Sequence, residues 1–198
     1  QPLFPLWSAN EFRAEVKQVR TESENCYTLV LKPTKKWQGF QPGQYVELQV
    51  IKDGAKVSRC FSISSAPAQY AQSGTIELTI RAQNKGRITP WLKQALTESS
   101  KVGLSAAQGD FIIKNRSRPI LMIAGGSGIT PFRSYLLSQA AISPTQKASL
   151  LYYARNQNEH LFKHELSSIS DGNKNLTTHL ISTSDIGHFS LEQLQQQC

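Results

Sequence analysis

Two short segments of the chain combine residue types that suit a phosphorylated aromatic ligand. The first is residues 59–65 (Arg-Cys-Phe-Ser-Ile-Ser-Ser), whose side chains would alternate between the two faces of an extended strand. Arg59 offers a forked donor to a phosphate, Phe61 a flat face for a ring, and Ser62 a hydroxyl for a ring nitrogen. The same residues also fit an ordinary strand with a surface arginine, so this segment alone leaves both interpretations open.

The second segment is residues 125–131 (Gly-Gly-Ser-Gly-Ile-Thr-Pro), which follows the apolar run 120–124. Glycines after a buried strand allow a tight turn and close approach to a phosphate, and the next helix directs free N–H groups at its charge. Thr130 is expected to cap that helix, with Pro131 in its first turn. We call residues 125–128 the downstream glycine turn. It lacks the third glycine of G-x-G-x-x-G, and a purely structural turn is the alternative.

The elements that would position the first segment are short strands. From Phe12 to about Asn115, apolar and polar residues alternate in runs punctuated by Gly and Pro, which is typical of an antiparallel barrel or sandwich. A short helix is expected over residues 90–96. We therefore predict an antiparallel β-barrel domain over residues 1–115.

Beyond residue 116 the pattern changes to apolar runs separated by helical segments. Strands are expected at 119–124, 148–154 and 176–182. The first two are continuously apolar, as a parallel sheet covered on both faces requires. Helices are expected at 131–141, at 160–169, and after Ser190, where Ser190 and Gln193 could form a capping box. Residues 116–198 thus read as an incomplete α/β doubly wound parallel sheet.

Three strands and a last helix make a small nucleotide-type sheet, and the chain begins at Gln1 without a methionine. We expect an excised piece of a longer protein, truncated within the second domain. Comparison of the intact mass with that of the encoded protein tests this expectation.

Composition narrows the class of partner. The formal charge of +8 suits an anionic cofactor, an acidic protein or nucleic acid, but the basic residues are scattered and do not favour nucleic acid. The three cysteines, Cys26, Cys60 and Cys198, show no CxxC spacing, so neither a metal site nor a disulfide framework is expected, and a cytoplasmic setting is natural. No apolar run approaches the ~20 residues of a membrane span.

The ordered set of motifs resembles the ferredoxin-NADP reductase superfamily over nearly the whole chain. It comprises residues 42–45 (Pro-Gly-Gln-Tyr), 59–65, 86–89 (Gly-Arg-Ile-Thr), 125–131 and 151–153 (Leu-Tyr-Tyr). The combination is far more specific than any single motif. The resemblance implies FAD, with FMN less favoured, and NADPH or NADH as substrate.

The same resemblance assigns roles to residues. It places Arg59 at the flavin pyrophosphate, Phe61, where relatives carry tyrosine, against the flavin, and Ser62 near flavin N5 as the one catalytic candidate. Residues 86–89, the upstream glycine turn, would face the pyrophosphate. The residues predicted to contact the cofactors are Tyr45, Arg59, Cys60, Phe61, Ser62, Ile80, Arg81, Gly86, Arg87, Ile88, Thr89, Gly125, Gly126, Ser127, Gly128, Thr130, Pro131 and Arg155.

The implied reaction is hydride transfer from nicotinamide to flavin, followed by release of single electrons to an iron-sulfur or haem acceptor. The acceptor would be an acidic ferredoxin-like protein or a fused domain. No C-x4-C-x2-C run is present, so a [2Fe-2S] cluster is expected only in a segment outside this sequence. The family's Cys-Gly-Pro turn also has no counterpart here.

Several choices stay open. Arg155, Ser182 and Thr183 favour NADPH, whereas Asp185 favours NADH, and of the two we expect NADPH. One alternative function is a flavin-binding electron-transfer subunit that does not react with nicotinamide. Another is a basic binding module in which both glycine turns are structural. The sequence does not choose the physiological acceptor or the oligomeric state.

Overall fold

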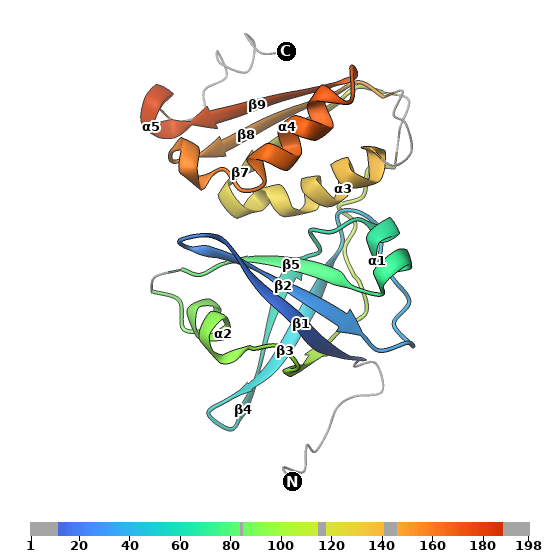
Figure 1. Cartoon of the computed structure of the whole chain (residues 1–198), viewed down its shortest axis with the longest axis vertical. Coiled ribbons are helices and arrows are strands. Elements are labelled where there is room, and N and C mark those ends of the chain that lie inside the picture. Colours follow the sequence, from blue (N-terminus) through green and yellow to red (C-terminus); the bar gives the residue numbers. More distant parts are fainter. Residues whose placement is uncertain (1–11, 84, 115–117, 141–145, 188–198) are drawn as a thin grey trace.

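A computed structural model describes residues 12–83, 85–114, 118–140 and 146–187. Figure 1 shows two sheets one above the other, with α3 lying between them. The lower body is built from β1 (Phe12–Ser23), β2 (Cys26–Pro33), β3 (Tyr45–Lys52), β4 (Ala55–Ser62), β5 (Ile76–Arg81) and β6 (Lys101–Leu104). Its two short helices are α1 (Pro67–Ser73) and α2 (Thr89–Ala95).

These six strands form an antiparallel sheet in the order β4-β3-β6-β1-β2-β5. An isolated bridge from Ile63 to Leu78 joins the chain just beyond β4 to β5, so the two edges of the sheet meet and the barrel closes. Closure removes the open edges on which another chain could pair. The predicted antiparallel barrel is therefore confirmed.

Alternation of side chains creates the barrel core. Fully buried side chains include Tyr27, Leu29 and Leu31 on β2, which alternate along the strand as the period of two requires. The β3–β4 hairpin turns at Asp53-Gly54, where both residues have positive φ (51° and 75°), as a type I′ turn demands. A tight turn at this point fixes the register that carries through to Ser62, opposite Tyr45.

The upper body is a parallel sheet in the order β7-β8-β9. Its elements are β7 (Ile120–Gly125), the 3₁₀ turn η1 (Gly126–Ile129), α3 (Thr130–Ala140), β8 (Ala148–Ala154), η2 (Gln157–Glu159), α4 (Lys163–Asp171), β9 (Leu176–Ser182) and α5 (Thr183–Ile186). The predicted β-α-β-α-β order is confirmed. The helix expected after Ser190, the chain end at Cys198 and the boundary at residues 115–116 lie outside the described residues.

The expectation that both faces of this sheet are covered holds only for its central strand. β8 is buried from Leu150 to Ala154, on both faces. On β7, however, Leu121 and Ile123 are 40% and 45% exposed in the described part of the chain, because α3 and α4 pack against the opposite face. The prediction that β7 is covered on both faces was therefore wrong for the face that carries Leu121 and Ile123.

The start of α4 also differs from its prediction. Residues 157–159 form η2, and Phe162 has a positive φ of 61°, so the helix begins at Lys163 and not at His160. His160 is buried, with Nε2 at 3.1 Å from the Tyr152 carbonyl oxygen and its ring edge-on to that of Tyr152. A buried polar contact thus interrupts the helical periodicity at this point.

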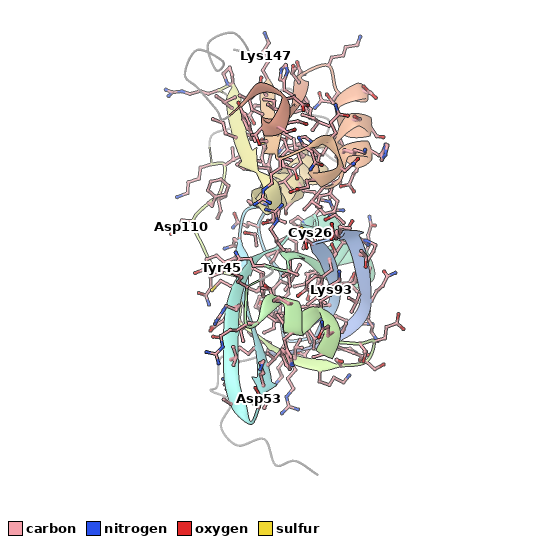
Figure 2. The ribbon with its side chains drawn as sticks, turned by 90° about the vertical axis from the view of Figure 1, so that its left-hand side faces the viewer. Cys26, Tyr45, Asp53, Lys93, Asp110 and Lys147 are labelled. Atoms are coloured by element: carbon pink, nitrogen blue, oxygen red, sulfur yellow. The ribbon has the colours of Figure 1, made fainter. Side chains whose placement is uncertain are left out.

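The two bodies share a packed interface. Cys26, at the start of β2, is 1% exposed and belongs to the core cluster of the upper sheet, where Met122 and Ile129 lie. Figure 2 shows Cys26 at the level where the barrel meets the upper body. This contact brings the end of β7 beside β5, so that Gly126 lies against Arg81.

Candidate functional site

A cavity of about 430 Å³ opens where the barrel meets the start of α3. Its volume is within the range of ligand pockets in proteins. It is lined by Arg59, Cys60, Phe61, Ser62, Thr79, Ile80, Arg81, Gln83, Gly86, Arg87, Ile88, Thr89, Ser127 and Thr130. The structure thus brings the end of β4, the end of β5, the upstream glycine turn and the downstream glycine turn to one place.

Residues 59–62 at the end of β4, which we call the β4 wall, form one side of the cavity, and their exposure decreases toward the barrel core. Arg59 and Cys60 are exposed, Phe61 and Ser62 are half-buried, and Ile63 is fully buried in the barrel core. Arg59 Nη1 donates to the Ser58 carbonyl at 2.6 Å, and in the described part of the chain Arg59 makes no ion pair. Its remaining N–H groups are available to an anion in the cavity.

The upstream glycine turn is closed by two hydrogen bonds to the backbone of Gln83. Gly86 N donates to the Gln83 carbonyl at 2.7 Å, and the Thr89 hydroxyl accepts from Gln83 N at 3.3 Å. A Cβ on Gly86 would lie 3.0 Å from that same Gln83 oxygen, so only glycine fits without movement. Because the Thr89 hydroxyl accepts within the turn, its own proton is free to be donated into the cavity.

Tyr27 anchors the helix that follows this turn. Its phenol donates to the Thr89 carbonyl at 2.8 Å, from the floor of the barrel. Burial raises the pKa of Tyr27 well above its usual value, so the phenol keeps its proton and remains a donor. The start of α2 is therefore fixed to β2.

The downstream glycine turn is held by side chains. The Tyr152 phenol donates to the Gly126 carbonyl at 3.0 Å and accepts from Leu161 N at 2.9 Å. Burial raises the pKa of Tyr152 to about 12, which keeps this donor protonated. Gly126 has φ +51°, a left-handed conformation that favours glycine.

Thr130 does not act as the predicted cap. η1 runs directly into α3, and the Thr130 hydroxyl donates back to the Ser127 carbonyl at 3.0 Å. The 3₁₀ turn therefore takes the place of a capping residue, and Thr130, 6% exposed, lines the inner wall of the cavity. Pro131 lies in the first turn of α3, as expected.

Arg81 lies between this cavity and a second one. The second cavity, of about 440 Å³, is lined by Asn25, Arg81, Ala82, Gln83, Lys85, Arg155 and Glu159. Arg81 Nη2 pairs with the Glu159 carboxylate at 2.9 Å, and its guanidinium would be 3.3 Å from a Cβ on Gly126. Arg81 Nε is buried without a partner in the described residues. The guanidinium thus connects β5 with the downstream glycine turn and with η2.

Some predicted residues lie outside the first cavity. Tyr45 does not line it; its ring packs over Gly109, where a Cβ would be 2.9 Å away, and its backbone pairs with Gln108. Arg155 lines the second cavity, and Gly125, Gly126, Gly128 and Pro131 are not among the lining residues. For all predicted residues, contact with a cofactor stays a prediction.

Sequence reasoning missed several residues at this junction. Glu159 and Lys85 line the second cavity, and Glu77 and Arg133 form a buried ion pair between the two bodies at 2.6 Å. No motif marked them, because their partners are distant in sequence. Glu77 was one hint, since it is a carboxylate within an otherwise apolar β-strand run.

Among the described residues, no three His, Cys, Asp or Glu side chains gather as metal ligands would. No helix in the described ranges is long and apolar enough to span a membrane.

The arrangement defines a two-domain oxidoreductase fold, with a barrel followed by a nucleotide-type sheet. The oxidoreductase FAD-binding domain family matches residues 13–113, and the oxidoreductase NAD-binding domain family matches residues 122–191. The chain belongs to the oxidoreductase FAD-binding domain family, and it has the two-domain fold of the ferredoxin-NADP reductases that its motifs resemble. FAD and a nicotinamide nucleotide are the cofactors of these domains.

Individual relatives agree. The chain is 30% identical over 98% of its length to an NADPH oxidoreductase of Mycobacterium tuberculosis, covering 51% of that protein. It is 29% identical, over 72% of its length, to the glycine betaine monooxygenase reductase subunit of Chromohalobacter salexigens, covering 38% of it. The chain spans about half or less of these relatives.

Solved structures show the same fold. The FAD/NAD-binding domain of a nitric oxide dioxygenase from Vibrio cholerae superposes with a TM-score of 0.78 at 24% identity, covering 91% of this chain and 80% of that one. A ferredoxin NADP+ reductase from Neisseria gonorrhoeae with bound FAD and NADP gives 0.77 at 18% identity, covering 92% and 71%.

Proposed function

We propose that this chain is the flavin and nicotinamide module of a reductase, which accepts a hydride from NAD(P)H on FAD and passes electrons singly to an iron-sulfur or haem acceptor. The observation that carries the proposal is the meeting of the β4 wall and both glycine turns at one cavity. A basic binding module would not need two anion-binding turns that face an aromatic wall.

The cavity residues fit FAD. Arg59 and Arg87, both exposed and lining the cavity, would hold the pyrophosphate, together with the backbone N–H groups of the upstream glycine turn and the Thr89 hydroxyl. Phe61 supplies an apolar face, without the phenol hydroxyl that tyrosine would add. Ile80, 1% exposed, closes the floor.

Bound FAD supplies the hydride and single-electron chemistry. Ser62 is the one side chain we assign a catalytic role, a hydrogen bond to the flavin ring nitrogen. Its position at the end of β4, half-buried and lining the cavity, places a neutral donor where water is partly excluded. A Ser62→Ala variant that is reduced at the normal rate would remove that assignment.

We further propose that NADPH is preferred to NADH. The second cavity presents Lys85, Arg81 and Arg155, and Arg155 is the nearest of these to the carboxyl ends of β8 and β9, since its carbonyl accepts from Ser184 N at 2.9 Å. The carboxylate that would favour NADH, Asp185, accepts a hydrogen bond from the Ser184 hydroxyl at 2.9 Å. Arg155→Met should weaken binding of NADPH but not of NADH; equal weakening would refute the preference.

The acceptor is inferred from chemistry and relatives. Relatives include a subunit named as a monooxygenase reductase and another named as a dioxygenase electron transfer component. We propose an acidic ferredoxin-like protein or a fused iron-sulfur domain, which the charge of +8 would attract.

The first test is FAD affinity. The chain, incubated with excess FAD and desalted, should keep a flavin absorption band. Arg59→Met should weaken FAD binding by ~10- to 100-fold, because it removes a charge-assisted hydrogen bond. Lys36→Met, which removes an exposed charge outside the cavity, is the matched control and should have no effect. No flavin retained by the wild type, or equal loss in both variants, would contradict the proposal.

A further inference from the structure

The segment that follows β4 is locked to β5. Ser64 N and Ser64 Oγ both donate to the Glu77 carbonyl, at 2.9 and 3.1 Å, and Glu77 N donates to Ser65 Oγ at 3.0 Å. Ser64 and Ser65 are fully buried. Ser62, two residues earlier, lines the cavity, so this lock sets the end of the flavin-binding wall.

The first turns of α3 hold the same two residues from the other domain. Arg133 Nη1 donates to the Ser64 carbonyl at 3.1 Å, and the Ser134 hydroxyl donates to the Ser65 carbonyl at 2.6 Å. α3 continues from the downstream glycine turn, whose Ser127 lines the cavity. Arg133 and Ser134 therefore join α3, and the downstream glycine turn before it, to the segment that follows the β4 wall, through two hydrogen bonds from buried side chains.

Arg133 is held in one geometry. It is 5% exposed, and its fork bonds one carboxylate from each domain: Glu77 on β5 at 2.6 Å, and Glu165 on α4 at 2.5 and 2.9 Å. Its guanidinium carbon lies 4.2 Å from the centre of the Phe162 ring. A planar fork can satisfy these directions simultaneously, whereas a lysine ammonium cannot.

The charge states support this arrangement. Burial on its own would raise the pKa of Glu77, but the charges of Arg133 and Arg20 outweigh it and lower that pKa below its usual value. Burial likewise opposes the charged form of Arg133, and Glu165 and Glu77 outweigh it and raise the pKa. Glu77 and Arg133 therefore both stay ionised at neutral pH.

We propose that Arg133 is a positioning residue that sets the separation between the β4 wall and the downstream glycine turn, and through it the distance from the nicotinamide to the flavin. This inference rests on the proposed function. Hydride transfer requires near-contact of the two rings, and a misplacement of about 1 Å can cost ~100-fold in rate. Arg133 itself touches neither cavity.

The test compares Arg133→Met and Arg133→Lys with Arg20→Met. Arg20 contacts the same Glu77, at 3.3 Å, but from β1 within the barrel, so its loss leaves the link between domains intact. In the FAD-loaded chain, both Arg133 variants should lower the limiting rate of anaerobic flavin reduction by ~10-fold or more and weaken the nicotinamide–flavin charge-transfer band. FAD and nucleotide affinities should change by less than about twofold, and Arg20→Met should behave as the wild type.

Ser134→Ala removes one buried hydrogen bond and leaves no buried charge unpaired. It should also lower the rate of flavin reduction, but by less than the Arg133 variants, and it replaces them in the test if they fail to fold. Unchanged rates and charge-transfer bands in the folded variants would overturn the inference, as would rescue by lysine.

Hydrogen exchange separates this inference from the proposed function. If neither nucleotide reduces the wild-type flavin, the proposed function fails. The link is then judged by amide exchange: faster exchange at residues 63–65 and 130–136 in Arg133→Met, but not in Arg20→Met, supports it. Exchange equal to that of the wild type overturns it.

Discussion

The two glycine turns border the same cavity but are held in place by different means. The upstream turn, residues 86–89, is closed by hydrogen bonds to Gln83 and anchored by the Tyr27 phenol, all within the barrel. The downstream turn, residues 125–128, is held by Tyr152 from β8 and lies against Arg81 from the barrel. The contacts of the upstream turn therefore come from its own domain, whereas the downstream turn has contacts from both domains.

This difference implies that the two domains contribute unequally to positioning the β4 wall and the two glycine turns around the cavity. The β4 wall and the upstream turn take their contacts from within the barrel, through strand pairing, Gln83 and Tyr27. The downstream turn runs into α3, which is bonded to the barrel at Ser64 and Ser65. Changes at the interface should therefore act on the nucleotide side of the site first.

The largest effect is expected from the buried pair between the domains. Glu77→Gln and Arg133→Met should each lower the free energy of unfolding by about 3 kcal/mol, because each breaks the buried pair and leaves the other charge with a single ionic partner, Glu165 for Arg133 and Arg20 for Glu77. The double variant should lose less than the sum of the two. Denaturant unfolding of the four chains measures this coupling, and strictly additive losses would show that the pair does not link the domains.

Tyr152→Phe tests whether a side chain holds the downstream turn. Removing the hydroxyl leaves the Gly126 carbonyl and Leu161 N without their partner, at a cost of about 1–3 kcal/mol. Nucleotide affinity should fall while FAD affinity is kept. Tyr153→Phe, on the opposite face of the same strand, is the control, and equal effects of the two changes would argue against the assignment.

Gly126→Val should weaken nucleotide binding by ~10-fold, because a β-branched residue in the left-handed region costs about 1–2 kcal/mol. Its Cβ would also press on the Arg81 guanidinium. Gly74→Val has a similar positive φ of 69°, far from the site, and controls for stability alone. Isothermal titration with NADPH is the measurement, and unchanged affinity would show that the turn does not meet the nucleotide.

Acid should loosen the domain contact reversibly. The pKa of Glu77 is lowered from 4.5 in the folded chain, so its contribution to stability is present above about pH 4.5 and is lost as the pH falls through the folded pKa. The effect should be smaller than that of substitution, since a protonated carboxyl still forms hydrogen bonds. Arg20→Met should shift the loss of stability to higher pH, because Arg20 helps to lower the pKa of Glu77. If the variant has the same pH profile of unfolding as the wild type, this explanation of the acid effect is wrong.

The smallest effect is expected at the upstream turn. Gly86→Ala places a Cβ 3.0 Å from the Gln83 carbonyl oxygen, a contact that a shift of a few tenths of an ångström relieves. FAD affinity should fall a few-fold and nucleotide affinity should not change, which is the reverse of the Gly126→Val pattern. Fluorescence titration with FAD measures it, and a loss of nucleotide affinity would mean that the turns are not independent.

Much of the fold was predictable because it is encoded locally. Alternation along β2 and β3 and the apolar run of β8 gave strands at the right positions, and residues 59–62 of the motif at 59–65 line the cavity. Burial of β7 was overestimated, since composition does not reveal which face the helices cover. The start of α4 was misplaced because His160 is buried by a tertiary contact.

The candidate site was predictable only where a motif is continuous. Arg59, Ser62 and Thr89 belong to short runs, and all three line the cavity, while their contact with a cofactor stays a prediction. The ion pairs Arg133–Glu77 and Arg81–Glu159 join residues more than fifty positions apart in sequence, so no local pattern could mark them. Tyr45, which does not line the cavity, packs over Gly109, which also lies far along the chain.

The most direct test of this account is an anaerobic titration of the FAD-loaded chain with NADPH and with NADH, followed by the flavin absorption band. The account predicts that the chain retains FAD and that NADPH bleaches the band at lower concentration than NADH. If FAD is retained but neither nucleotide bleaches it, the chain is an electron-transfer subunit without nicotinamide chemistry. That result would contradict the claim that both glycine turns serve one reaction.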